Sequence, residues 1–129
     1  MTTSTLRQSI KGEVLSAADP EFERAALDIW NKYGPPKRRP QLIVRVANEQ
    51  DVVETVRFAR SENLKIAVRG GGHLWCNPTL RRGGMMIDLA NLNQVISIDA
   101  NSFIRKRIST VLDRRRHPVL ATAIGRNAL

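Results

Sequence analysis

The sequence has one cysteine, Cys76, and no uninterrupted apolar stretch near the roughly 18 residues that a membrane-spanning helix needs. A single cysteine excludes an internal disulfide and provides no framework for a zinc site. Residues 1–11 are polar and lack the apolar segment and cleavage site typical of a secretory signal. These absences argue against a membrane protein or a disulfide-stabilised secreted one, and we expect a cytoplasmic chain.

Aromatic residues are also scarce, at 5% of the chain, so we expect a mainly aliphatic core. With 42% hydrophobic and 26% charged residues, the composition is that of an ordinary globular protein. The length of 129 residues suits one domain with a modest core and leaves little room for a second.

Acidic residues are few, 12 against 21 lysines and arginines, which gives a net charge of +9. Residues 102–129 contain seven basic residues and one acidic residue, a net charge of +6, against +3 for residues 1–101. Such asymmetry is found in nucleic-acid-binding proteins. The sequence offers neither interleaved aromatic residues for base stacking nor a recognisable groove-reading helix, so this stays the lesser alternative.

Residues 1–40 are interpreted as a helical lead-in. Pro20 is suited to the first position of a helix over residues 21–30, which places Phe22, Ala25, Ala26 and Ile29 at helical spacing. The basic residues 37–40 are interpreted as a solvated linker rather than a binding patch.

Residues 41–68 predict a strand, a helix and a second strand. Residues 41–46 and 64–68 are short, apolar and β-branched, and the helix between them begins after Asn48, a suitable N-cap, and ends near Asn63. Val52, Val56 and Ala59 are predicted to form its buried face. Such a unit normally has parallel strands joined by a right-handed crossover.

Further strands are predicted at residues 85–88 and 94–98, and Ile108 to Leu112 could begin a helix. We therefore expect an α+β fold: a small sheet built around the strand–helix–strand unit, with helices on one side. The organisation is a lead-in over residues 1–40, a domain over residues 41–99 and a basic, divergent tail over residues 100–129.

The segment that carries chemistry is the glycine run that follows the second predicted strand. Glycine loses the most backbone freedom on folding, so three in succession indicate a sharp turn or a close approach of the main chain to a ligand. Exposed N–H groups in such a turn form an anion site suited to a pyrophosphate, and Arg69 adds positive charge at its edge. The spacing matches neither common nucleotide-binding fingerprint, and a plain glycine turn is an equally good interpretation.

His73 ends this turn, where an imidazole could serve as a base, a ligand or an attachment point. On the residues alone, a histidine that only hydrogen-bonds nearby backbone is the better interpretation. A metal site is not expected, because the other histidine, His117, lies far away and no cluster has ligand spacing.

In order, the segments at residues 39–45, 48–52, 56–60, 68–73, 83–89 and 92–93 resemble the PCMH-type FAD-binding domain of the vanillyl-alcohol oxidase family. The chain is most similar to its berberine-bridge-enzyme-like members. The resemblance runs from about Gly12 to Asp99, and it is the combination of motifs that makes it specific.

The resemblance implies a flavoprotein oxidoreductase with FAD as cofactor. It places the FAD pyrophosphate against the backbone of Arg69, Gly70, Gly71, Gly72, His73 and Leu74. His73 matches the histidine that many members link covalently to the 8α-methyl group of the flavin. The turn at Gly83 and Gly84 and the strand into Asp88 and Leu89 would hold this loop. Val46 and Ala47 match a region near the cofactor. The implied reaction is oxidation of a C–H bearing OH or NH, with O2 as acceptor.

The sequence departs from the family in two places. After His73 it has Leu74 where a small polar residue is usual, and Pro78 follows soon after; Cys76 is interpreted as a buried or bystander thiol. After Asp99 the family's next glycine-rich loop is missing. We therefore expect only the first part of the domain, in a truncated form that lacks the catalytic base and substrate pocket; a small-molecule substrate would need the missing domain. An inactive or partner-completed fragment is the main alternative.

Overall fold

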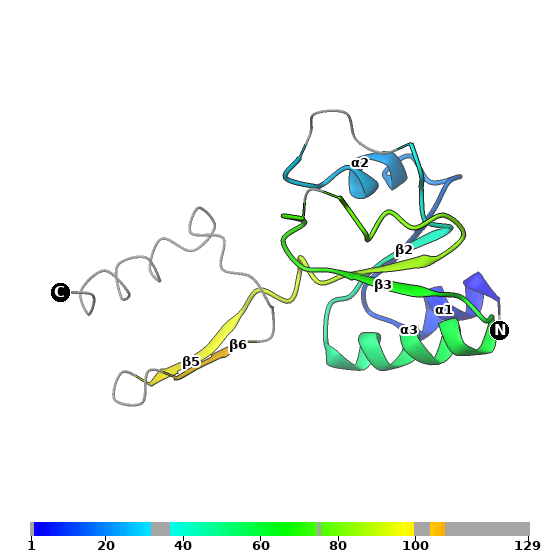
Figure 1. Cartoon of the computed structure of the whole chain (residues 1–129). Helices are drawn as coiled ribbons and strands as arrows, with labels where there is room; N and C mark the ends of the chain where they lie inside the picture. Colours follow the sequence, from blue (N-terminus) through cyan, green and yellow to red (C-terminus); the bar gives the residue numbers. More distant parts are fainter. Residues whose placement is uncertain (1, 32–36, 75, 100–103, 108–129) are drawn as a thin grey trace.

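A computed structural model of the chain describes residues 2–31, 37–74, 76–99 and 104–107 (Figure 1). The elements in order are α1 (Thr3–Ser9), β1 (Glu13–Ser16), α2 (Phe22–Ala26), β2 (Leu42–Arg45), α3 (Glu49–Ser61), β3 (Ile66–Arg69), β4 (Met85–Asp88), β5 (Val95–Asp99) and β6 (Ile104–Arg107). Among these described helices, none has the length and apolar character needed to cross a bilayer.

The main sheet has four strands in the order β1-β2-β4-β3, with β1 antiparallel to β2 and the other three parallel. The strand–helix–strand prediction is confirmed by β2, α3 and β3. The two strands joined by α3 are not neighbours in the sheet, because β4 lies between them and pairs with both. All four residues of β4 are buried, which fits the apolar sequence of a central parallel strand.

Helices cover both faces of this sheet, so the prediction of helices on one side is wrong (Figure 1). On the face of α1 and α3, the core contains Leu6, Val44, Phe58, Ala59 and Ile87 with their neighbours. The residues that alternate with these along the strands face α2, and there Ile43 and Met86 are buried with Phe22, Ala25 and Ala26. A sheet with apolar side chains on both faces needs a covering layer on each.

Helix α3 begins and ends as predicted, and two of the three residues predicted for its buried face lie at the core, Ala59 buried and Val52 partly buried. The Asn48 side chain accepts a hydrogen bond from the Asp51 N–H, and Asn63 adopts the left-handed conformation that often follows a helix end. The buried residues are Asp51, Thr55, Phe58 and Ala59, whereas Val56 is 44% exposed. Val56 lies one residue, about 100° around the helix, from Thr55, which turns it away from the sheet.

The carboxylate of Asp51 ties the lead-in to the domain. It accepts hydrogen bonds from the N–H groups of Lys11 at 2.9 Å, Gly12 at 2.8 Å and Ala47 at 2.8 Å. A Cβ at Gly12 would lie 2.0 Å from the carbonyl oxygen of Arg45, so only glycine allows this approach. The buried charge is therefore fully hydrogen-bonded, as buried carboxylates need to be.

The lead-in differs from its prediction in three respects. Strand β1 was not predicted, because its sequence has only two apolar residues, Val14 and Leu15, between the polar Glu13 and Ser16. Helix α2 spans only Phe22–Ala26 with Glu21 as its N-cap, so Pro20 precedes the helix rather than opening it. Phe22, Ala25, Ala26 and Ile29 are nevertheless all buried, as their spacing predicted.

The basic linker is not simply solvated. Arg38 donates hydrogen bonds to the carbonyl oxygens of Cys76 and Asn77, and Arg39 pairs with Glu23 at 3.0 Å. Both arginine side chains therefore connect the linker to neighbouring segments.

The strand predicted at residues 94–98 is present as β5, but it pairs with β6 in a separate antiparallel sheet. Strand β6 was not predicted and lies in the basic tail. The helix start considered at residues 108–112, like the rest of the tail from residue 108 onward, lies outside the described residues.

Candidate functional site

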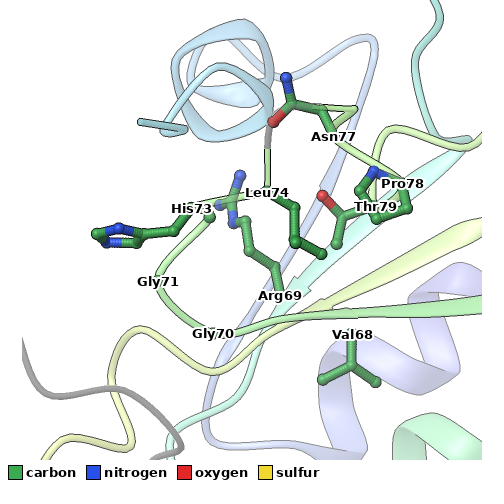
Figure 2. A pocket seen from close by; sticks show the side chains of 10 residues that line it. Val68, Arg69, Gly70, Gly71, His73, Leu74, Asn77, Pro78 and Thr79 are labelled. Carbon is green, nitrogen blue, oxygen red and sulfur yellow. The ribbon is translucent and has the colours of Figure 1, made fainter. Parts of the chain in front are cut away.

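The glycine turn lies at the carboxyl end of β3 and borders a cavity of about 210 Å³ (Figure 2). The cavity is lined by residues 68–74 and 77–79. The carboxyl ends of parallel strands are where open α/β sheets commonly bind ligands. All six residues predicted to contact a cofactor, from Arg69 to Leu74, border this one cavity.

Gly72 gives the turn its shape. Its φ of +68° is in the left-handed region that favours glycine. A Cβ at this position would lie 3.1 Å from the carbonyl oxygen of Asp28 and 3.3 Å from the Cα atom of Ile29. The Trp30 N–H donates to the carbonyl oxygen of Gly72 at 3.0 Å. The segment that follows α2 therefore supports the turn from behind, and a side chain at residue 72 would collide with it.

The N–H groups of this turn remain available to a ligand. Those of Gly71, Gly72 and His73 have no hydrogen-bond acceptor among the residues that the structure describes. Gly71 is exposed and Gly70 and Gly72 are half-buried, so along these three residues the cavity is bordered by main chain alone. Successive free N–H groups in a turn are typical of an anion site.

Arg69 does not lie where the sequence analysis placed its charge. The side chain is buried, and its Nη2 atom is 2.7 Å from Oδ2 of Asp88 while Nη1 donates to the carbonyl oxygen of Ala26 at 3.3 Å. Its positive charge is therefore neutralised inside the protein. A free cation at the edge of the turn, as predicted for Arg69, is corrected by this ion pair.

Asp88 is the member of the site that sequence analysis underestimated. The parallel register aligns Arg45, Asp88 and Arg69 as the last residues of β2, β4 and β3. Asp88 is also 3.5 Å from Nε of Arg45, and its Oδ1 accepts from the Ala90 N–H at 3.1 Å. The signal in the sequence was that three predicted strands each contain or precede a charged residue at one end.

His73 and Leu74 are both exposed, Leu74 to 64%. In Figure 2 the imidazole of His73 extends away from the side chains of Leu74 and Thr79. His73 thus borders the cavity with an exposed imidazole. Cys76 is exposed too, which rules out the buried alternative for its thiol and leaves the bystander one.

Other residues tied to the cofactor lie elsewhere. Val46 is buried in the core and Ala47 donates its N–H to Asp51, so neither borders the cavity. Gly83 and Gly84 precede β4 and lie at the opposite end of the strands from the glycine turn. The support predicted from the strand into Asp88 and Leu89 is present, since the Leu89 N–H donates to the carbonyl oxygen of Arg69 at 2.9 Å. No group of three metal-binding side chains occurs within the described ranges.

The geometry fits the pyrophosphate of a dinucleotide cofactor. A diphosphate requires free N–H groups beside a cavity. The turn has both, and the missing side chain of the left-handed Gly72 leaves space for the turn itself. With Arg69 already paired, the groups left to an anion at this turn are main-chain N–H groups.

Comparison with known proteins points to one family. The FAD binding domain family matches residues 40–114. The (R)-6-hydroxynicotine oxidase of Paenarthrobacter nicotinovorans is 38% identical over 87 residues, which cover 67% of this chain and 18% of that protein.

Solved structures give the same result. The crystal structure of 6-hydroxy-D-nicotine oxidase from Arthrobacter nicotinovorans is 36% identical with a TM-score of 0.65, over 77% of this chain and 20% of that one. A variant of berberine bridge enzyme is 29% identical with a TM-score of 0.64, over 77% of this chain and 21% of that one. The chain thus spans about a fifth of the length of these relatives.

Proposed function

Because this chain belongs to the FAD binding domain family, we propose that it is the FAD-binding portion of a flavin-dependent oxidoreductase. The observation that supports this most directly is the glycine turn at the end of β3, which presents free N–H groups to a cavity. In this proposal the backbone of Arg69, Gly70, Gly71, Gly72, His73 and Leu74 holds the pyrophosphate of FAD.

Each group at the turn has a defined part in binding. In this proposal the N–H groups of Gly71, Gly72 and His73 donate to the phosphate oxygens, and the left-handed conformation at Gly72 sets the path of the turn. The contact between Trp30 and Gly72 keeps the turn from collapsing into the cavity. Exposed Leu74 contributes an apolar edge beside the ligand.

His73 is proposed as the point of covalent attachment, through a ring nitrogen to the 8α-methyl group of the flavin. Its exposed position at the rim of the cavity supports this role. A covalent link would retain the cofactor even if the surrounding contacts were few.

Bound FAD would supply hydride chemistry, and the protein would position it. For the whole protein we propose oxidation of a C–H bearing OH or NH, with O2 as acceptor. Two relatives named above are nicotine-derivative oxidases. Each relative extends well beyond the fifth that this chain matches, so a small-molecule substrate would be bound by parts outside that match.

The test is the visible absorbance of the purified chain, supplied with FAD, before and after acid precipitation. Flavin colour that stays with the precipitate is the expected result, and His73→Ala should release it to the supernatant. His117→Ala, which removes the other histidine, is the matched control and should keep the colour bound.

Two other outcomes would change the proposal. Colour that the unmodified chain releases on precipitation would leave FAD binding intact but remove His73 as the attachment point. A folded chain that takes up no FAD would overturn the binding proposal itself and favour an inactive or partner-completed fragment.

We also propose a cytoplasmic location. The support is the single cysteine, whose exposed thiol would remain reduced in that compartment. Fractionation of cells that express the chain would test this.

A further inference from the structure

Arg69 directly precedes the glycine turn, yet its guanidinium is directed into the protein. One terminal nitrogen is 2.7 Å from the Asp88 carboxylate on β4, and the other donates to the Ala26 carbonyl at the end of α2. The side chain is 2% exposed. A guanidinium with both terminal nitrogens engaged on buried partners has no free fork for a phosphate.

Asp88 has the complementary arrangement. Its side chain is 1% exposed, and it joins the ends of three parallel strands by pairing with Arg69 and lying 3.5 Å from Arg45. Main-chain hydrogen bonds reinforce the same level of the sheet, since Val46 donates to the carbonyl of Asp88 and Leu89 to that of Arg69. The carboxylate therefore fixes where β3 ends and the glycine turn begins.

The turn is held at both ends against one segment. Arg69, at its start, contacts Ala26, and Gly72, near its finish, accepts from the Trp30 N–H at 3.0 Å. Residues 26–30 thus support the turn; apolar packing holds them on the sheet, and the Arg69 side chain links them to the start of the turn. Without the ion pair, the first of these two attachments would be lost.

We propose that Arg69 and Asp88 are positioning residues for the FAD pyrophosphate: the ion pair sets the geometry of the turn, and Arg69 is not a phosphate ligand. The inference rests on the proposed function. Because the pair carries no net charge, it adds nothing to the electrostatic attraction of the anion. Affinity should therefore depend on the pair, while the salt dependence of affinity should not.

The test uses FAD and the full chain with His73→Ala as the parent, so that no covalent bond removes the equilibrium. The dissociation constant is measured from flavin fluorescence at low and high sodium chloride. Asp88→Asn leaves the Arg69 charge unpaired, and the double variant Arg69→Met with Asp88→Leu removes both charges. Glu49→Gln is the matched control, because it makes the same charge change at an exposed position.

We expect Asp88→Asn to weaken FAD binding by about tenfold, as for one lost hydrogen bond to a charged group. The double variant should weaken it similarly and keep the salt dependence of the parent, and Glu49→Gln should change the affinity little. A defect of folding alone would not preserve the salt dependence alongside a native circular dichroism spectrum.

The opposite pattern would overturn the inference. If Arg69 binds phosphate, Asp88→Asn frees it and tightens binding, and the double variant loses part of the salt dependence. Should Asp88→Asn fail to fold, the double variant carries the test alone, since it leaves no unpaired buried charge. If the parent binds no FAD, the proposed function fails and the inference falls with it. If the parent binds FAD but Asp88→Asn tightens binding, only the inference is refuted.

Discussion

At the scale of single residues, the candidate site consists mainly of main-chain N–H groups that no side chain covers, and side-chain charges contribute little to it. Gly72 has no Cβ atom to press on the segment behind the turn, and the charge of Arg69 is already paired with Asp88. His73 borders the cavity with an exposed imidazole, which is why it is the proposed attachment point. An anion site of this kind is formed by main-chain N–H groups, whose positions are set by backbone conformation.

Gly72→Ala tests the role of that missing Cβ, with Gly83→Ala as its control. Both glycines are left-handed, at +68° and +67°, so each substitution should destabilise the fold by about 1–2 kcal/mol. A Cβ at Gly83 meets nothing within 4 Å, whereas at Gly72 it presses on the Asp28 carbonyl. FAD affinity should therefore fall in Gly72→Ala alone, measured by flavin fluorescence. Equal losses in both variants would show that the support behind the turn is unimportant.

Asp19 gives the fold a dependence on pH. The Ser16 N–H and hydroxyl both donate to its carboxylate at 2.8 Å, and Arg7 pairs with it, so the pKa of Asp19 lies below its ordinary value. A lower pKa in the folded state means that the ionised carboxylate stabilises the fold above the unfolded-state pKa. That stabilisation is lost as the pH falls through the folded-state pKa.

Asp19→Asn should therefore unfold at lower urea concentration than the unmodified chain near neutral pH, and the difference should shrink in acid. Urea unfolding followed by circular dichroism over a pH series measures this. Asp28 is exposed, and Asp28→Asn, which makes the same charge change, is the control. It should lower the urea midpoint less than Asp19→Asn does. If the difference in urea midpoint between Asp19→Asn and the unmodified chain stayed constant down to the lowest pH, the lowered pKa of Asp19 would be contradicted.

At the scale of elements, the position of β4 decides how the site is assembled. Because β4 lies between β2 and β3, the charge that ends it reaches the arginines that end both neighbours. Had β2 and β3 paired directly, Arg45 and Arg69 would have faced each other without a carboxylate between them. The inserted strand thus converts a repulsive pair of cations into a connected row.

Helix α3 shows which apolar residues hold the layers together. Phe58 is buried against the sheet, so Phe58→Ala should lower the free energy of unfolding by about 3–5 kcal/mol. Val56 is 44% exposed, so Val56→Ala should change it by less than about 0.5 kcal/mol. Denaturant unfolding followed by circular dichroism compares the two. A large effect at Val56 would mean that this face of α3 is covered in solution.

At the scale of the whole molecule, the site forms where the sheet meets the layer that contains α2. The sheet provides the glycine turn and the Asp88 carboxylate, and the α2 layer provides the Ala26 carbonyl and the Trp30 N–H. Neither layer alone fixes the turn at both ends. The lead-in is therefore part of the binding architecture, although it carries no residue of the predicted site.

Local sequence patterns were enough for much of this. Short apolar runs predicted β2, β3 and β4, and the Asn48 cap with its following acids predicted α3, because strand and helix signals are contained in neighbouring residues. The glycine run ending at His73 located the candidate site, and the order of motifs indicated the FAD-binding family. Strand β1 was missed because only two of its residues are apolar, and the length of α2 was misjudged because the apolar spacing continues to Ile29 beyond the helix end at Ala26.

The sequence by itself determined the strand–helix–strand unit, the glycine turn and the family, since each is written in adjacent residues or in their order. Only the tertiary structure decided that β4 lies between β2 and β3, that α2 covers the second face of the sheet, and that the Arg69 charge is paired with Asp88. The reason is distance along the chain: Arg69 lies 19 residues from Asp88 and 43 from Ala26, and only strand register and layer packing bring such groups together.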